Sequence, residues 1–282
     1  MSVKIIIDST ADMIPAVKKK CGIVPLTIRF GEEDFTDGVT ITHHEFYEKL
    51  VSSDILPTTS QPTPAAFAQA YEAAIQAGDQ VVIITISAKL SGTYQSATIA
   101  AMDYPGDIYV VDSQTAALGT GILAELALQL AESGMGAAEI AQRLTEEREN
   151  IHLVAIVDTL EYLKKGGRIS KTVAFAGELL SIKPIISVPA GEIVILGKAR
   201  GNKQANSMMT NQIQAAGGVD FSKPFLLGYA GVSEAPLQKY IADSESLWAE
   251  HSGELPITII GSVIGTHVGP GAVAAAFFAK DI

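Results

Sequence analysis

Small hydroxyl residues open a predicted helix at Ser91-Gly92-Thr93, a few residues after the apolar run Val81–Ile86. Gly92 allows a ligand to approach the backbone closely, because glycine has no side chain. Two hydroxyls and the N–H groups at a helix start can hold a carboxylate or a phosphate without a metal ion. The P-loop spacing Gly-x-x-x-x-Gly-Lys-Ser/Thr is absent, so these residues indicate an anion site rather than a nucleotide site.

Two other segments place hydroxyl side chains after predicted strands or before helices. Thr59 and Ser60 lie in the proline-containing segment 58–64, ahead of a helix. Such residues either cap the helix or direct donors toward an anion at its N-terminus, and the sequence leaves both interpretations open. Asp8 and Ser9 follow the run Val3–Ile7, where capping of a strand-to-helix turn is the simpler interpretation and ligand contact the alternative.

Positive charge is concentrated in one part of the chain. Residues 164–203 carry eight cationic residues against Glu178 and Glu192, a net charge of +6 within a chain whose total is −11. The cationic residues are Lys164, Lys165, Arg168, Lys171, Lys183, Lys198, Arg200 and Lys203. This segregation favours an anion or phosphate site, which arginine can engage with two hydrogen bonds, over a merely solvated surface.

His267 stands among four glycines and a proline in the segment 261–271, which we predict to be a constrained loop. A single histidine is either a hydrogen-bonded structural residue or a functional donor or base. The other histidines, His43, His44, His152 and His251, show no metal-ligand spacing with it, so the sequence predicts no zinc site. No Gly-x-Ser-x-Gly segment is present, which disfavours a serine hydrolase.

The elements that must position these residues alternate between strand and helix from Val3 to about Asn150. This alternation predicts a mostly parallel sheet covered by helices on both faces. We expect strands at Val3–Ile7, Val24–Phe30, Val81–Ile86, Ile108–Val111, Leu153–Val157, Pro184–Val188, Ile193–Leu196, Phe225–Tyr229 and Ile257–Ile260. We expect helices after the capping box at Thr42–Glu45 and at Ala65–Ala77, Thr93–Met102, Leu118–Glu132, Ala137–Glu149, Gln204–Ala216 and Pro236–His251.

After residue 150 the pattern changes, since Pro184–Val188 and Ile193–Leu196 flank a turn and predict an antiparallel hairpin. We therefore predict a two-domain α/β protein. Residues 1–150 form an N-terminal α/β domain with a mostly parallel sheet, and residues 151–282 form a C-terminal α/β domain of α+β character.

Composition excludes several classes of protein. With 48% hydrophobic and 18% charged residues the chain is not generally disordered, and its acidity disfavours a duplex-binding protein. Cys21 is the only cysteine, which excludes an intrachain disulfide. No run approaches the ~20 apolar residues of a membrane span, and the N-terminal apolar run is too short for a signal peptide. We expect a cytoplasmic location.

Taken together, these segments resemble the DegV family of bacterial fatty-acid-binding proteins. The resemblance spans nearly the whole chain, and its Ser-Gly-Thr, Lys-Gly-Gly-Arg-Ile and Thr-His-x-Gly-Pro-Gly sequences are specific in combination. The matching segments are Ile7–Asp12, Thr58–Pro62, Leu90–Ala97, Tyr162–Ile169, Ile182–Ile186 and Gly265–Gly271.

The resemblance implies a carrier that holds one long-chain fatty acid, such as palmitate, stearate or oleate, in an apolar tunnel with its carboxylate at the domain interface. It implies that the chain is the binding subunit of a fatty acid kinase and not an enzyme by itself. A separate ATP-dependent, DAK-like kinase subunit would phosphorylate the carboxylate, and the acyl phosphate would enter phospholipid synthesis. Peripheral membrane contact is compatible with this role, whereas a cofactor, a metal and a nucleic acid are not implied.

The resemblance also implies roles for individual residues. Thr59, Ser60, Ser91, Gly92 and Thr93 would hold the carboxylate, with His267 nearby. Arg168 and Arg200 would support phosphoryl transfer or docking of the kinase subunit. The residues leave two other functions open: a stand-alone small-molecule kinase or phosphotransferase, suggested by the cationic segment and His267, and a DNA-binding regulator, suggested only by the charge of that segment.

Overall fold

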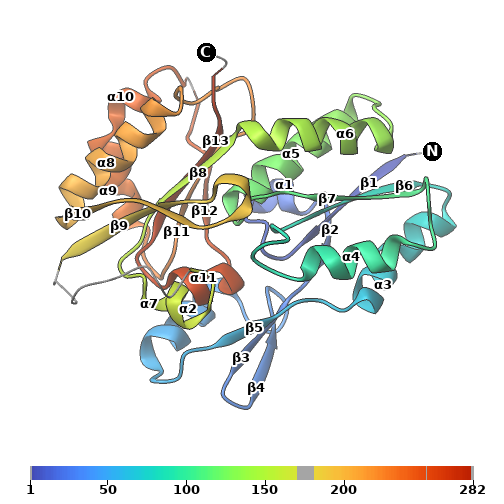
Figure 1. The fold of residues 1–282 in the computed structure, drawn as a ribbon, viewed down its shortest axis with the longest axis horizontal. Helices are drawn as coiled ribbons and strands as arrows, with labels where there is room; N and C mark the ends of the chain where they lie inside the picture. Colours follow the sequence, from blue (N-terminus) through green and yellow to red (C-terminus); the bar gives the residue numbers. More distant parts are fainter. Residues whose placement is uncertain (1, 170–180, 252, 281–282) are drawn as a thin grey trace.

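A parallel sheet forms the first half of the computed structural model, which describes residues 2–169, 181–251 and 253–280 (Figure 1). Its strand order is β2-β1-β6-β7. The strands are β1 (Val3–Asp8), β2 (Gly22–Val24), β6 (Gln80–Thr85) and β7 (Ile108–Asp112). The helices α3 (Pro64–Gln76) and α4 (Thr93–Ala101) cover one face, and α5 (Leu118–Glu132) and α6 (Ala137–Glu147) cover the other. Burial on both faces explains the nearly continuous apolar strands.

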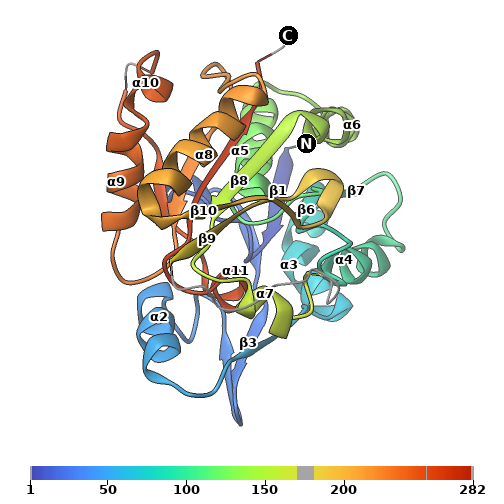
Figure 2. The same cartoon turned by 60° about the vertical axis from the view of Figure 1, so that its left-hand side comes forward.

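A six-stranded sheet forms the second half, in the order β10-β9-β8-β13-β11-β12. Its pairs are antiparallel except for the parallel pair β11–β12. The strands are β8 (Ile151–Ile156), β9 (Ile182–Ser187), β10 (Val194–Arg200), β11 (Leu226–Tyr229), β12 (Ile257–Ile259) and β13 (Val273–Phe278). The helices α8 (Gly201–Ala215), α9 (Ala235–Asp243) and α10 (Glu245–Trp248) pack on one face, and α5 packs on the other (Figure 2).

Alternate residues of β13 belong to two different apolar clusters, because successive side chains of a strand point to opposite faces. Val273, Ala275 and Phe277 pack with the helix α8. Ala274 and Ala276 face the opposite side, toward α5. The second face therefore carries small side chains where the two halves of the molecule meet.

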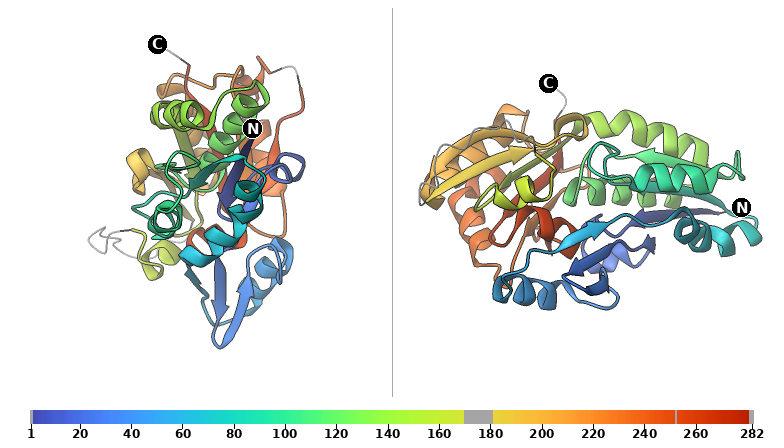
Figure 3. Two further views of the ribbon diagram at one scale, coloured as in Figure 1. Left: turned by 90° about the vertical axis from the view of Figure 1, so that its right-hand side faces the viewer. Right: turned by 60° about the horizontal axis from the view of Figure 1, so that its bottom comes forward.

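A small antiparallel sheet, in the order β4-β3-β5, projects from one end of the molecule (Figure 3, left). Its strands are β3 (Thr27–Phe30), β4 (Glu33–Thr36) and β5 (Thr58–Ser60), and the remaining helices are α1 (Pro15–Lys18), α2 (His43–Ser52), α7 (Glu161–Lys165) and α11 (Ser262–Val268). The predicted capping box at the start of α2 is present, since Glu45 N donates to Thr42 Oγ1 and Thr42 N donates to Glu45 Oε2.

The predicted fold class is confirmed: a parallel sheet flanked by helices is joined to a mostly antiparallel sheet. The predicted hairpin is present as β9 and β10, which turn through the short 3₁₀ segment Pro189–Gly191. The domain boundary near residue 150 stays a prediction. The last strand of the parallel sheet ends at Asp112, and the six-stranded sheet begins at Ile151.

Two predicted elements were wrong in detail, and one apolar strand was not predicted. The strand expected at Val24–Phe30 is two strands in two sheets, separated at Pro25, which lacks the N–H that a ladder requires. The helix expected at Pro236–His251 divides at Ser244, whose hydroxyl donates to Tyr240 O and accepts from Trp248 Nε1. The apolar strand β13 was missed altogether.

The segment 261–271 is not a loop throughout, because Ser262–Val268 forms the helix α11. Asp12 Oδ1 accepts the N–H of Gly261 at 2.8 Å, which fixes the start of this helix. Gly269 ends it with a φ of 74°, a conformation that glycine adopts without strain. The glycines that predicted a loop therefore serve helix packing and termination.

No helix within the described ranges combines the length and the hydropathy that crossing a bilayer demands.

Candidate functional site

A narrow apolar cavity lies where the carboxyl ends of the parallel strands face the six-stranded sheet. Open α/β sheets bind ligands at this edge, because the loops that follow the strands converge there. The loops after β1, β6 and β7 contribute Thr10, Ile86 and Ala116, and the opposite wall comes from β8, β9, β13 and α11. Its apolar wall residues include Leu153, Ala155, Ile186, Val263, Ile264, Val268 and Ala274.

The volume of this cavity is about 80 Å³. At ~30 Å³ for each water molecule, that is room for only a few waters, and far less than a long acyl chain occupies. A complete long chain therefore enters only if the lining side chains move apart. The wall is suited to such a chain in its chemistry, since its polar groups are confined to a few side chains: Thr10, Thr59, Ser91, Arg168, Ser187 and His267.

Thr59 and His267 meet at the polar side of the cavity. A hydrogen bond of 3.0 Å joins Thr59 Oγ1, on β5, to His267 Nε2, on α11. His267 Nδ1 is buried and has no hydrogen-bond partner among the described residues. Burial, and then the positive charge of Arg168, lower the pKa of His267 to about 4, so the imidazole is neutral at neutral pH.

Arg168 supplies the positive charge of the site. Its Nε donates to Leu90 O at 3.2 Å and its Nη1 to Gly166 O at 2.6 Å, which ties the end of α7 to the loop before α4. Burial lowers the pKa of Arg168, but a guanidinium stays protonated at neutral pH. A fixed cation beside a neutral imidazole favours an anionic group at this side of the cavity.

The helices α7 and α11 lie side by side, which brings Arg168 to His267 (Figure 2). Close approach depends on Gly166: a Cβ there would lie 2.2 Å from His267 Nδ1. Gly269 has a similar role, since a Cβ would lie 2.4 Å from the Tyr162 ring. The glycines near Arg168 and His267 thus allow α7 and α11 to pack closely.

The segment Ser91-Gly92-Thr93 has mainly a local role in this structure. Ser91 Oγ lies 2.8 Å from Thr93 Oγ1 and accepts from Thr93 N, so it stabilises the start of α4. Gly92 makes room for Gln61, since a Cβ would lie 2.0 Å from Gln61 Oε1. Of these three residues, Ser91 lines the cavity, whereas Gly92 and Thr93 do not.

Two other predicted site residues lie away from the cavity. Ser60 follows Thr59 on β5 and is exposed, because neighbouring strand residues point to opposite sides. Arg200 ends β10 as an exposed residue, and its N–H donates to Gln204 Oε1. The structure therefore brings together Thr59, Ser91, Arg168 and His267, and leaves Ser60 and Arg200 outside.

In the loop after β1, Asp8 and Ser9 stabilise the turn, which was the simpler of the two interpretations of this segment. Asp8 is buried and accepts hydrogen bonds from Thr10 N, Thr10 Oγ1 and Ile86 N. Its carboxylate therefore ties this loop to the end of β6, the neighbour of β1 in the sheet. Ser9 Oγ accepts from Leu26 N. Thr10, which was not singled out, is the residue of this segment that lines the cavity.

The apolar wall is the part of the site that sequence patterns missed. Ala272 and Ala274 belong to the apolar segment 272–279, which is far too short for a membrane span and in which we predicted no strand. A short continuous apolar run is consistent with a buried strand, but no pattern indicates that one face borders a cavity.

Part of the cationic segment is neutralised by ion pairs. Lys165 contacts Glu161 at 2.7 Å and Lys183 contacts Asp158 at 2.6 Å. Lys171 and Glu178 lie outside the described residues. No group of three or more His, Cys, Asp or Glu side chains with metal-binding geometry occurs in the part of the chain that the structure describes.

Comparison with known proteins gives concordant matches over the whole chain. The model of the DegV family, described as uncharacterised proteins, matches residues 2–280. A DegV domain-containing protein of Deinococcus radiodurans is 34% identical over 283 residues, covering 98% of each chain.

Solved structures agree. One described as fatty acid binding of a DegV family protein from Thermus thermophilus superposes with a TM-score of 0.88 at 32% identity, over 99% of this chain and 100% of that one. The fatty acid kinase (Fak) B3 protein of Streptococcus pneumoniae, loaded with linoleic acid, shares the fold with a TM-score of 0.85 at 23% identity, over 99% of this chain and 100% of that one.

Proposed function

The chain belongs to the DegV family, and from this membership we propose that it binds one long-chain fatty acid in the cavity between its two large sheets. The observation that carries the proposal is an apolar cavity with Thr59, Ser91, Arg168 and His267 at its polar side. The Thermus thermophilus relative, a fatty-acid-binding protein of the same fold, supports the same ligand class.

Burial of the acyl tail supplies most of the affinity in this proposal. Each buried CH₂ group contributes ~0.8 kcal/mol, so a sixteen-carbon tail supplies on the order of 10 kcal/mol before the costs of binding are subtracted. Part of this favourable free energy offsets the cost of moving apart the side chains that narrow the cavity to about 80 Å³. Palmitate, stearate and oleate are the ligands that we propose, without a further cofactor.

The polar side of the cavity orients the carboxylate. Thr59 and Ser91 offer hydroxyl donors, His267 offers a neutral imidazole, and the Arg168 guanidinium supplies a fixed positive charge. Gly92 and Thr93 act indirectly, by shaping the start of α4 that holds Ser91. Ser60, exposed on the other side of β5, has no contact with the carboxylate in this proposal.

The chain acts as a carrier for a separate ATP-dependent kinase subunit in this proposal. That subunit phosphorylates the presented carboxylate, and the acyl phosphate serves phospholipid synthesis. Arg168 stabilises the charge that develops during transfer. The exposed Arg200 belongs to the surface that the kinase subunit contacts. We propose that the pair works in the cytoplasm.

Extraction of the purified protein with organic solvent, followed by mass spectrometry, tests the proposal. We expect about one long-chain fatty acid per chain, or uptake of added palmitate or oleate after delipidation. Protein that neither carries nor takes up a fatty acid would refute it.

Assays for ATP turnover separate the carrier from a stand-alone kinase. The isolated chain should hydrolyse no ATP with palmitate present, and acyl phosphate should appear only after a kinase subunit is added. Turnover by the isolated chain would favour the stand-alone phosphotransferase instead.

A further inference from the structure

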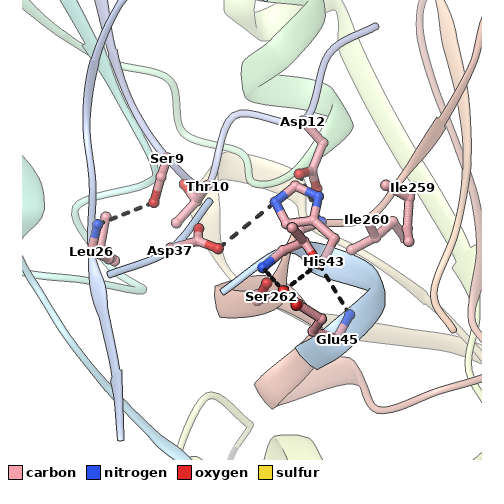
Figure 4. Close-up of polar contacts among 12 residues, drawn as sticks. Ser9, Thr10, Asp12, Leu26, Asp37, His43, Glu45, Ile259, Ile260 and Ser262 are labelled. Atoms are coloured by element: carbon pink, nitrogen blue, oxygen red, sulfur yellow. Dashed lines mark hydrogen bonds and ion pairs between the residues drawn. The ribbon is translucent and has the colours of Figure 1, made fainter. Parts of the chain in front are cut away.

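A second cavity, of about 350 Å³, is lined by two carboxylates, an imidazole and two lysines, Lys18 and Lys19, none of which the proposed function uses. Asp12 follows β1, Asp37 follows β4 and His43 begins α2. Figure 4 shows the His43 ring next to Asp12 and directed toward Asp37. We call Asp12, Asp37 and His43 the acid–imidazole cluster.

The carboxylates of this cluster are buried but incompletely hydrogen-bonded. Asp12 is 1% exposed and Asp37 is 3% exposed. Asp12 Oδ2 and both carboxylate oxygens of Asp37 have no hydrogen-bond partner among the described residues. Asp37 Oδ1 lies 3.8 Å from His43 Nε2, which is an ion pair only when the imidazole is protonated. For Asp12, this burial raises the pKa of the carboxyl group, because the charged form is poorly solvated.

The surrounding charges oppose one another. Burial first, and then the negative charges of Asp37 and Asp8, raise the pKa of Asp12 to about 7, against the opposing effects of Lys18 and the Gly261 N–H. Burial and Lys18 lower the pKa of His43, against Asp37. Lys19 also lines the cavity. Burial raises the pKa of Tyr47, and the negative charges of Asp12 and Asp37 and the neighbouring Tyr229 raise it further. With a pKa of about 7, Asp12 changes its charge near neutral pH.

The cluster is linked directly to the fatty-acid cavity through α11. Asp12 Oδ1 accepts the Gly261 N–H at the start of this helix, and Tyr47 Oη donates to Ile260 O one residue earlier. A Cβ on Gly261 would lie 2.8 Å from Asp12 Oδ1 and 3.5 Å from the His43 ring, so the contact is tight. His267, at the other end of α11, lines the apolar cavity.

We propose that the acid–imidazole cluster is a proton-linked positioning device: proton uptake at Asp12 loosens the start of α11 and weakens fatty-acid binding at the other end of that helix. The inference rests on the proposed function, because it concerns the affinity of the same cavity.

The hydrogen bond to Gly261 determines whether fatty-acid affinity rises or falls with pH. An ionised carboxylate accepts an N–H more strongly than a neutral carboxyl group does, and it also interacts favourably with the positive end of a helix. The ionised form of Asp12 therefore holds α11 in the position seen in the structure. Affinity should fall as the pH decreases through the range in which Asp12 binds its proton, and by reciprocity fatty-acid binding should release protons.

Isothermal titration with palmitate between pH 6 and pH 8 tests the proposal on three variants. For the wild-type chain we expect the affinity at pH 6 to be about fivefold lower than at pH 8, a typical coupling between sites. Asp12→Asn should remove most of this difference, because the amide cannot ionise but still offers an oxygen to Gly261. Asp103→Asn, a matched change at an exposed carboxylate that lines neither cavity, should behave as the wild type.

Asp37→Asn keeps the test decisive if Asp12→Asn fails to fold. Removing this negative charge should shift the midpoint of the pH dependence to lower pH, since Asp37 raises the pKa of Asp12. An unchanged midpoint in Asp37→Asn, or the same pH dependence in wild type and Asp12→Asn, would overturn the inference.

Hydrogen exchange distinguishes failure of the inference from failure of the proposed function. Exchange of the α11 amides, corrected for the intrinsic pH effect, should be faster at pH 6 than at pH 8 in the wild type and equal in Asp12→Asn. If palmitate binds at no pH, the proposed function fails while this measurement still reports on α11. If palmitate binds but α11 exchange is independent of Asp12, only the inference fails.

Discussion

His267 is a neutral hydrogen-bonding group at neutral pH, because burial and the Arg168 guanidinium disfavour its protonated form. It shares a hydrogen bond with Thr59 and cannot serve as a cation for the carboxylate. The charge of the site comes from Arg168, which is anchored on the carbonyl groups of Leu90 and Gly166. At the residue scale, then, the proposed function assigns orientation of the carboxylate and positive charge to different side chains.

A histidine titration followed by NMR should place the pKa of His267 near 4, against an ordinary value of 6.5. Folding lowers the pKa of His267, so this residue contributes its full stabilisation at a pH above the pKa of the unfolded state. The stabilisation is lost as the pH falls from about 6.5 toward 4. The contribution is roughly 3 kcal/mol at most. His267→Asn should therefore reduce the loss of stability between pH 6.5 and pH 4.5. A His267 pKa near 6.5 would contradict this account.

Ser91→Ala should weaken palmitate binding by about 1–2 kcal/mol, a 5- to 30-fold rise in Kd, because it removes a donor to a charged acceptor. Ser60→Ala is the matched control: the same hydroxyl is removed from an exposed residue outside the cavity, and the affinity should not change. Isothermal titration measures both. Equal affinities for Ser91→Ala and the wild type would mean that Ser91 only stabilises the start of α4.

The strand β13 separates two environments, and this separation creates the cavity. Val273, Ala275 and Phe277 fill the space under α8, whereas Ala272 and Ala274 leave room on the side of the ligand cavity. The helix α11 then brings His267 to the polar side of the same cavity. At the scale of elements, small side chains on one face of a sheet are as important to the proposed function as the polar groups.

Ala274→Val should reduce palmitate binding at least tenfold while the protein remains folded, since two added methyl groups occupy part of a cavity of about 80 Å³. Ala275→Val makes the same change on the other face of β13, where the packing is dense. That variant should lose about 1–3 kcal/mol of stability through overpacking and bind palmitate nearly as well as the wild type. If Ala275→Val weakened palmitate binding while Ala274→Val bound normally but was less stable in thermal denaturation, the ligand would lie on the other face of the sheet.

At the scale of the whole molecule, the cavity wall is shared between the parallel sheet and the six-stranded sheet, with α5 packed against both. A ligand in this position contacts both halves at once. Binding should therefore stabilise the molecule as a unit, because only the assembled halves form the site.

Delipidated protein should unfold at a lower temperature than the palmitate complex. At a free ligand concentration of 100 times Kd, the free energy of unfolding rises by about 2.7 kcal/mol, which corresponds to a Tm increase of roughly 5 °C for a chain of this length. Calorimetry should show a single transition that shifts as a whole. Two transitions, of which one ignores palmitate, would show that the ligand contacts one half alone.

The sequence by itself determined the alternation of elements, the fold class and most of the polar residues at the cavity. Apolar periodicity and turn residues are local signals, so the helices α2 to α6 and the β9–β10 hairpin were predictable. Thr59, Ser91, Arg168 and His267 were found from their segments, and the resemblance to the DegV family ordered them into one site.

Tertiary structure alone decided which of these residues meet. Ser60 was separated from Thr59 by the pleat of one strand, and the glycines around His267 proved to serve the packing of α7 against α11 and of α11 against α2. The hydrogen bond between Asp12 and Gly261 joins positions about 250 residues apart in sequence. The small residues Ala272 and Ala274 line a cavity to which residues near the N-terminus, such as Thr10, also contribute. Such contacts leave no local pattern, because they depend on how two sheets from different parts of the chain face each other.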